Sequence, residues 1–404
     1  MTDRRPTIAQ IIPSVDAGGA EVTTLEVTEA IVKAGGRALI LTEGGRLAAR
    51  IGAVGGEIIA FPAATKNPAR ILRNGYALRA LAQRQAVALI HARSRAPAWS
   101  ALIAARSLGL PLVTTYHGAY QEAGRLKKLY NGVMARADVV IANSRYTARA
   151  IERRYGTPSS RIATIFRGVD LDRFAPEAVA PERVNRLRQQ WGVGAQERVV
   201  LHAARLTPLK GQAVVIAAAR LLADAAACED CVFILAGDAG ARTGYRAALA
   251  ERIGAAGLAR RVRLVGHLDD MPAGLAAADL ALMVSTEPEG FGRVAVEAQA
   301  MGCPVIVSEI GALPEAVNAV AVAAEATGWL VAPGDAAALA AAIRQALALP
   351  AAARAAMSER ARAFVRANYS VTELQRGTLA VYDRLLGTEL APAFGGRGLN
   401  AATS

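Results

Sequence analysis

Short apolar runs alternate with amphipathic, helix-forming stretches along almost the whole chain, in two successive series. Repeated strand–helix units of this kind build a parallel sheet with helices on both faces, because parallel strands need a long crossover connection. The predicted strands are residues 7–15, 37–42, 57–61, 87–92, 112–116, 138–142 and 161–166 in the first series, and 198–203, 231–236, 262–265, 280–284 and 305–307 in the second. We therefore predict an α/β protein with two doubly wound parallel sheets.

The break between the two series divides the chain into two predicted domains. With 404 residues, the chain is longer than one ordinary domain. The alternation is interrupted over residues 170–195, where apolar residues are few and prolines and glycines recur. We expect a first domain over residues 1–175, a second over 190–369, long helices over about 335–386 and a disordered tail over 389–404.

One helix of the first series can be predicted in detail, over residues 67–86. Asn67 is a favourable N-cap, and Pro68 suits the first helical position, where its missing N–H does no harm. We expect its buried face to consist of Ile71, Leu72, Leu78 and Leu81.

The positive charge of the chain is concentrated in its first half. The formal net charge is +13; residues 1–175 hold 25 Lys and Arg against 12 Asp and Glu, and the remaining residues hold 22 of each sign. This asymmetry favours an anionic partner for the first domain, such as a membrane surface, an anionic glycolipid or a nucleic acid. An arginine-rich composition that only aids solubility stays open as the alternative.

The three cysteines, Cys228, Cys231 and Cys303, give no disulfide framework in a chain of this length, so a reducing cytosol is expected. The first two have CxxC spacing, but no second pair or nearby histidine completes a zinc site. No run of about 18 apolar residues occurs, so no membrane-spanning helix is predicted. The apolar stretch near the N-terminus is brief and ends in glycines, which indicates a first strand and not a signal peptide.

Two loops that follow predicted strands carry groups suited to anions. Gly18 and Gly19 lie between a strand and a helix, where backbone N–H groups can approach an anion. Arg205 and Lys210 lie on either side of a turn that leads into another helix, and Arg can form paired hydrogen bonds to phosphate oxygens. A plain tight turn and two solvated cations stay open as the alternatives. Neither domain opens with GxGxxG, which argues against a dinucleotide-binding dehydrogenase.

A third loop places two acids around glycines. Glu289 precedes the Gly-Phe-Gly turn of residues 290–292, and Glu297 lies eight residues further on, within the following helix. The glycines leave backbone amides free at the helix start, and ionised carboxylates accept hydrogen bonds from sugar or ribose hydroxyls. Acids near a helix start also complement the helix dipole, which is the alternative explanation.

Together these segments resemble the retaining glycosyltransferases of family 4, which have the GT-B fold of two Rossmann-like domains facing across a cleft. The resemblance extends over nearly the whole chain, in matching order and spacing. Besides the Glu289-x7-Glu297 pair, it rests on Gly18-Gly19 with Glu21, His117-Gly118, Asn143-Ser144, Gly168-Val169-Asp170 with Phe174, Arg205, Lys210-Gly211, Ala236-Gly237-Asp238, Val265-Gly266, Gly311-x-x-Pro314-Glu315 and Gly328-Trp329-Leu330-Val331.

The resemblance implies roles for the matching residues. Arg205 and Lys210 would neutralise the diphosphate of a nucleotide-sugar donor, and Glu297 would bind its ribose hydroxyls. Glu289 would hold the donor sugar, and His117 would lie near its anomeric carbon. The predicted catalytic residues are His117, Glu289, Arg205 and Lys210. The predicted donor site consists of Gly18, Gly19, Arg205, Lys210, Gly237, Gly266, Glu289, Gly290, Phe291, Gly292 and Glu297.

The resemblance also implies a mechanism without a metal ion, a cofactor or a protein nucleophile, since the nucleotide sugar is itself a substrate. The acceptor would attack from the face that the nucleoside diphosphate leaves, and the leaving phosphate would take its proton. Glu289 as a covalent nucleophile is the less favoured alternative, because paired-carboxylate chemistry belongs to hydrolases of another geometry. The last helix, residues 370–388, would pack back on the first domain.

In such enzymes the first domain usually binds the acceptor, here expected to be a glycan or lipid-linked sugar of the cell envelope, as in lipopolysaccharide synthesis. We expect a cytoplasmic protein and hypothesise that its basic helices dock peripherally on the anionic inner face of the cytoplasmic membrane. Solvated helix faces stay open as the alternative. The basic residues concerned are Arg70, Arg73, Arg79, Arg84, Arg125, Lys127, Lys128, Arg145, Arg149, Arg153 and Arg154.

Two other functions stay open. A nucleotide-sugar epimerase of the same fold would turn over the donor without an acceptor. A nucleic-acid-binding protein would use the basic first half, but the basic residues are not interleaved with aromatics and no known binding motif occurs, so a nucleic acid is not expected as a partner.

Overall fold

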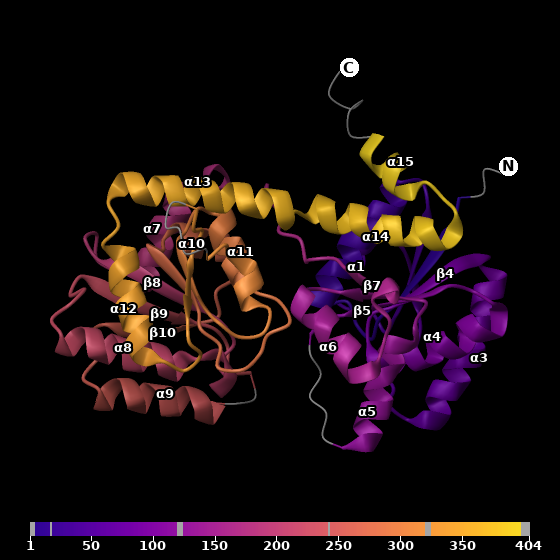
Figure 1. The fold of residues 1–404 in the computed structure, drawn as a ribbon, viewed down its shortest axis with the longest axis horizontal. Coiled ribbons are helices and arrows are strands. Elements are labelled where there is room, and N and C mark those ends of the chain that lie inside the picture. Colours follow the sequence, from indigo (N-terminus) through magenta and orange to yellow (C-terminus); the bar gives the residue numbers. More distant parts are fainter. Residues whose placement is uncertain (1–4, 17, 119–123, 241–242, 320–324, 397–404) are drawn as a thin grey trace. The chain divides into compact units, whose positions relative to one another are not determined.

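The computed structural model describes residues 5–16, 18–118, 124–240, 243–319 and 325–396. The chain forms two compact units: the first consists of Met1–Gly168 together with Val371–Ser404, and the second of Val169–Ser370. Figure 1 shows helices around a sheet in each of them.

The first unit contains a seven-stranded sheet of order β3-β2-β1-β4-β5-β6-β7, in which every neighbouring pair is parallel. The order reverses between β1 and β4, and in such sheets ligands bind outside the carboxyl ends of the strands at this point. The strands are β1 (Thr7–Ile11), β2 (Arg37–Thr42), β3 (Glu57–Ala60), β4 (Val87–Ala92), β5 (Leu112–Tyr116), β6 (Val139–Ala142) and β7 (Ile162–Thr164).

Eight α-helices of the first unit lie within the described residues. They are α1 (Gly19–Lys33), α2 (Ala48–Ala53), α3 (Pro68–Arg84), α4 (Arg95–Leu108), α5 (Arg125–Asn131), α6 (Arg145–Tyr155), α14 (Val371–Leu386) and α15 (Leu390–Gly396). As predicted, Asn67 caps α3 by accepting hydrogen bonds from the N–H groups of Ala69 and Arg70. The expectation that Leu72 is buried was wrong, because this side chain lies on the outer face and is 49% exposed.

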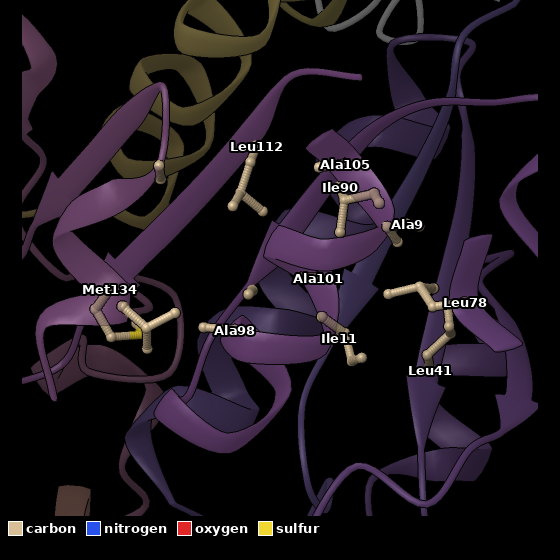
Figure 2. Close-up of a cluster of buried hydrophobic side chains, with 14 of the residues drawn as sticks. Ala9, Ile11, Leu41, Leu78, Ile90, Ala98, Ala101, Ala105, Leu112 and Met134 are labelled. Carbon is tan, nitrogen blue, oxygen red and sulfur yellow. The ribbon is translucent and has the colours of Figure 1, made fainter. Parts of the chain in front are cut away.

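Alanines allow α4 to pack closely on the sheet of the first unit. Ala98, Ala101 and Ala105 recur along one face of the helix and are fully buried (Figure 2). Small side chains bring the helix near the larger Ile11 and Ile90 of the strands, which belong to the same core cluster.

The C-terminal helix α14 is part of the core of the first unit, although its sequence follows the whole second unit. The hydroxyl of Tyr382 is 2.6 Å from Nδ1 of His91 in β4, and both side chains are fully buried. The amide of Gln375 donates to the carbonyl of Glu26 in α1, at 2.8 Å.

A disordered tail was expected from residue 389, and the structure differs over the first part of it. Leu390–Gly396 form α15, because the Asp383 carboxylate accepts the N–H groups of Leu390 and Ala391 and so caps the helix start. Leu390 is only 4% exposed, so the segment also packs on the core. Residues 397–404 lie outside the described residues.

The second unit contains a six-stranded parallel sheet of order β10-β9-β8-β11-β12-β13, with the reversal between β8 and β11. The predicted fold class, two doubly wound parallel sheets, is confirmed. The strands are β8 (Arg198–Ala203), β9 (Cys231–Ala236), β10 (Val262–Gly266), β11 (Leu280–Met283), β12 (Val305–Ser308) and β13 (Trp329–Val331). The sequence-based strands did not include β13, which has only three residues.

The helices of the second unit are α7 (Pro181–Gln190), α8 (Gln212–Asp224), α9 (Thr243–Ala255), α10 (Met271–Ala276), α11 (Arg293–Ala300), α12 (Ala336–Leu347) and α13 (Ala351–Asn368). The unit begins at Val169, whereas the first domain was expected to extend to residue 175. The N–H of Val169 donates to the carbonyl of Tyr369 at 2.6 Å, which ties this segment to the end of α13.

The first strand is shorter than predicted. It ends at Ile11 and not at residue 15, because Pro13 has no N–H for the ladder.

Among the described residues, no single helix has the length and apolar composition to cross a membrane. The pair α12 and α13 meets these criteria only when taken together, and it is bent by 107° at the break.

Candidate functional site

The predicted site residues of the second unit follow the carboxyl ends of its strands. Arg205 comes after β8, Gly237 after β9 and Glu289 after β11, while Gly266 is the last residue of β10. Loops at this edge, beside the point where the strand order reverses, are where doubly wound sheets bind ligands.

Lys210 and Glu289 form an ion pair at the centre of this edge. Nζ of Lys210 is 2.6 Å from Oε1 of Glu289, and the two side chains are 21% and 17% exposed. The hydroxyl of Ser285 donates to the same carboxylate oxygen. Two donors hold Glu289 in one orientation, and the cation beside it is available to a further anion.

Two glycines allow the loops of this edge to approach one another. Gly211 has φ +80°, and a Cβ there would lie 1.9 Å from the carbonyl oxygen of Val284. A Cβ at Gly237 would lie 1.9 Å from the carbonyl oxygen of Ala204. Its N–H already donates to the Gly266 carbonyl at 2.6 Å, so Gly237 serves close packing here.

A cavity of about 580 Å³ opens between the loops after β8, β9 and β10, within the size range of small-molecule sites. Its lining includes Arg205, Gly237 and His267. Gln212, which is fully buried, donates its amide to the Arg205 carbonyl at 2.9 Å and so fixes the backbone that carries the guanidinium.

Glu297 is deeply buried in α11. Its side chain is 7% exposed, and Nε of Arg293 donates to its Oε1 at 2.8 Å. Burial raises the pKa of this carboxyl, and the nearby Arg293 opposes that rise only in part. A buried acid with one cationic partner is suited to accept hydrogen bonds from hydroxyl groups.

The raised pKa of Glu297 predicts a pH-dependent effect of Glu297→Gln. Between the ordinary value of 4.5 and the higher value of the folded state, the folded protein binds more protons than the unfolded chain. The free energy of unfolding contributed by this group therefore falls as pH rises. We expect Glu297→Gln to gain thermal stability relative to the parent as pH is raised from 4.5 to 7, with the difference growing by a few degrees.

Thermal unfolding across this pH range checks the expectation, with Glu251→Gln, an exposed acid of α9, as the matched control. A difference that stays constant or reverses with pH would contradict it.

The turn between the two acids leaves backbone donors at the start of α11. Gly292 is the N-cap residue, and no side chain caps the helix. Among the described residues, the N–H groups of Phe291 and Gly292 have no hydrogen-bond acceptor. Phe291 is 9% exposed and packs against the Tyr369 ring, with centroids 5.8 Å apart, which holds the turn in place. Gly290 lies in the loop between them and Glu289.

In the first unit, Gly18 and Gly19 form the N-terminal end of α1. Gly18 is the N-cap residue and has no capping side chain. A Cβ at Gly18 would lie 2.3 Å from Oε2 of Glu21, so the Glu21 carboxylate occupies the positive end of this helix. The two glycines therefore leave room for the side chains of Glu21 and Arg167 beside the helix start.

His117 follows β5 and contacts Arg167, which follows β7. Nη2 of Arg167 is 3.1 Å from Nδ1 of His117. Burial, followed by the charges of Arg167 and Arg93, lowers the pKa of His117 well below its usual value. Nε2 of His117 is buried and has no hydrogen-bond partner among the described residues. Such an unsatisfied group costs about 1–3 kcal/mol and is typical of functional sites.

Sequence reasoning missed several residues in these loops and at the starts of the helices that follow them. Arg167, Ser285, Arg293 and Gln212 all contact predicted site residues. Arg167 directly follows a predicted strand, as His117 does, so its position at the same edge of the sheet was the available indication.

Asp170, the cysteines and possible metal ligands were also considered in the sequence, and the structure describes them as follows. Asp170 accepts a hydrogen bond from the Arg173 N–H and so closes a turn. The cysteines are free. Within the described part of the chain, no group of three or more His, Cys, Asp or Glu side chains has the geometry of a metal site.

Two family models match the chain. The model for Glycosyltransferase Family 4 matches residues 17–173, and that for Glycosyl transferases group 1 matches residues 184–364. The chain belongs to glycosyltransferase family 4. Its fold is GT-B, as the resemblance implied, and members of this family retain the anomeric configuration and act without a metal ion.

Several solved structures are similar to this protein over nearly the whole chain. A glycosyltransferase from Rickettsia africae ESF-5 is 29% identical with a TM-score of 0.86, and the match covers 95% of this chain and 100% of that one. HepE of Anabaena, solved with UDP-glucose, is 26% identical with a TM-score of 0.77, covering 94% and 100%. WaaG, a glycosyltransferase of lipopolysaccharide biosynthesis, is 19% identical with a TM-score of 0.68, a likeness of fold alone.

Curated relatives match over a shorter stretch. The D-inositol 3-phosphate glycosyltransferase of Salinispora arenicola is 36% identical over 185 residues, which is 44% of this chain and 41% of that protein. The match thus spans about two fifths of the relative's length.

Proposed function

We propose that this family 4 chain transfers a sugar from a nucleoside-diphosphate sugar to a hydroxyl group of a glycan or lipid-linked acceptor, with retention and without a metal ion. The observation that supports it best lies at the carboxyl ends of the second unit's strands. The residues that follow these strands include the cations Arg205 and Lys210 and the acids Glu289 and Glu297, and loops there line a cavity. Cations suit a diphosphate, and fixed carboxylates suit sugar and ribose hydroxyls.

A uridine nucleotide is the donor that the similarity favours. HepE of Anabaena, which is 26% identical, has been solved with UDP and with UDP-glucose. In this proposal the base enters the cavity beside His267, and Glu297 accepts hydrogen bonds from the ribose.

The proposed chemistry depends on preorganised charge. Negative charge grows on the leaving diphosphate in the transition state, and Arg205, Lys210 and the free amides of Phe291 and Gly292 would stabilise it. Such groups contribute most in a partly buried site, where water screens them little. No side chain needs to act as the nucleophile.

A thermal-shift panel of UDP-, GDP- and ADP-sugars tests the donor. A ligand at 100 times its Kd stabilises the folded state by about 2.7 kcal/mol, which is several degrees for a unit of this size. We expect UDP-sugars to raise the midpoint of the parent and not that of Glu297→Ala.

Glu251→Ala serves as the control variant and should respond as the parent does. If no nucleotide sugar shifts the parent midpoint, the proposed donor site is refuted. Turnover of the bound donor without any acceptor, giving an epimer, would favour the epimerase instead.

The acceptor side of the proposal rests on the exposed basic and apolar side chains of two helices of the first unit, α3 and α5, which together are called the basic face here. Leu72 and Tyr76 of α3 are 49% and 58% exposed, and Leu126 and Leu129 of α5 are 84% and 54% exposed. Exposed leucines beside cations are typical of peripheral membrane contacts. The exposed cations of this face are Arg70, Arg73, Arg79, Arg84, Arg125, Lys127 and Lys128.

We expect the chain to sediment with phosphatidylcholine vesicles that contain phosphatidylglycerol, and not with pure phosphatidylcholine. Each cation near an anionic surface contributes about 1 kcal/mol, so Lys127→Gln with Lys128→Gln should weaken binding by roughly 30-fold. Arg220→Gln, on α8 of the second unit, is the control. Vesicle binding that depends neither on anionic lipid nor on these lysines would refute membrane docking by this face.

A further inference from the structure

Arg167 contacts His117 at two atoms. Its Nη2 is 3.1 Å from the ring Nδ1 and 3.4 Å from the backbone carbonyl oxygen of His117. A guanidinium has only N–H donors, has no acceptor and stays charged in proteins. In this contact Nδ1 is therefore the acceptor, and it carries no hydrogen.

The protonation state of the other ring nitrogen, Nε2, follows from that of Nδ1. A neutral imidazole carries one hydrogen, so in His117 that hydrogen lies on Nε2. Nε2 is buried and has no hydrogen-bond partner among the described residues. His117 thus presents an N–H donor that nothing in the described part of the chain accepts.

Gly19 provides the space for this arrangement. A Cβ on Gly19 would lie 2.3 Å from Nη1 of Arg167, so any larger residue would displace the guanidinium. Gly19 is the first residue of α1 and has no left-handed backbone conformation. Its lack of a side chain is required by Arg167 and not by the backbone.

We propose that Arg167 is a positioning residue that holds His117 as the neutral Nε2–H tautomer, so that His117 donates a hydrogen bond to a substrate oxygen and does not accept a proton. The statement about the substrate rests on the proposed transferase function. The statement about the tautomer rests only on the contacts within the first unit.

Long-range ¹H–¹⁵N correlation spectra of the imidazole rings test the tautomer in the full-length protein. The chain has four histidines, and His117→Gln identifies the His117 signals by their loss. We expect a protonated Nε2 and an unprotonated Nδ1 in the parent at pH 7. Arg167→Lys, which still donates, should keep this pattern, and Arg167→Glu, which accepts, should move the hydrogen to Nδ1.

Two further variants complete the test. Gly19→Ala should shift the Nδ1 resonance by displacing Arg167, and the fold should tolerate it because the obstructing atom ends a flexible side chain. Arg106→Met, which loses a surface contact to Asp138 in the same unit, should leave the spectrum unchanged. The proposal is overturned if His117 of the parent is protonated on Nδ1. It is also overturned if the spectrum of the His117 ring is the same in Arg167→Glu and in Gly19→Ala as in the parent.

Kinetics test the substrate contact. Arg167→Glu should lower kcat on the order of 100-fold, as expected for the loss of one preorganised donor, whereas Arg167→Lys should keep most of it. His117→Gln, whose amide N–H reaches the position of Nε2, should retain more activity than His117→Asn. An inverted tautomer with unchanged kcat would refute the substrate contact. A parent without transferase activity would refute the proposed function and leave the tautomer result standing.

Discussion

Replacing Lys210 with methionine is expected to lower kcat/KM for sugar transfer on the order of 100- to 1,000-fold. The Nζ of this residue lies 2.6 Å from Glu289, at the edge where the leaving diphosphate would develop charge. Initial rates of nucleotide release with the donor from the thermal-shift panel measure the effect. Arg220→Met, which breaks an exposed pair with Asp224 in the same unit, should change the rate little.

A second variant separates catalysis from the loss of an ion pair. Lys210→Met leaves the Glu289 carboxylate without its cation, which by itself could disturb the site. In the double variant Lys210→Met with Glu289→Gln, no charge is left unpaired. The double variant is compared with Glu289→Gln alone. If Lys210 acts on the diphosphate, the double variant is slower than Glu289→Gln; equal rates in these two variants would show that Lys210→Met failed because it left the Glu289 carboxylate unpaired.

Replacing Gly211 with alanine is expected to destabilise the second unit by more than 4 kcal/mol, which is exceptional for one substitution. The left-handed conformation accounts for about 1–2 kcal/mol of this. The remainder comes from the Cβ, which would lie 1.9 Å from the Val284 carbonyl oxygen. Urea unfolding followed by circular dichroism measures the loss.

Gly334→Ala is a matched control for this prediction. Gly334 has φ +81°, nearly that of Gly211 at +80°, and a Cβ there would have nothing within 4 Å. Its cost should be limited to the backbone term of about 1–2 kcal/mol. Equal losses of unfolding free energy in the two variants would mean that the close approach of Gly211 to Val284 does not contribute to the effect of Gly211→Ala.

Much of the fold was predictable because local pattern determines it. The strands β2, β4, β5, β8 and β9 begin and end where the apolar runs do. Long buried strands of a parallel sheet are apolar on both faces and so stand out in a sequence. The three-residue strand β13 was missed because it is too short for any period to show.

The candidate site was predictable in part. Residues that follow strands could be placed at one edge of each sheet, and Lys210 and Glu289 indeed meet there, 79 positions apart. Arg293 and Ser285 were missed because arginine and serine in a loop or on a helix surface are too common to indicate a partner. The apolar pattern also did not show that Leu72 is exposed, because Ile71 and Leu78 of the same helix are buried.

The sequence by itself determined the two parallel sheets, the ends of the strands at which the proposed site lies and the family, because periodicity and motif spacing are local properties. Only the tertiary structure decided which side chains meet across the chain. Tyr382 reaches His91 over 291 positions, and Arg167 reaches His117 over 50. Such pairs depend on how helices and strands pack, and a guanidinium beside an imidazole determines where a proton lies only once that packing has brought them together.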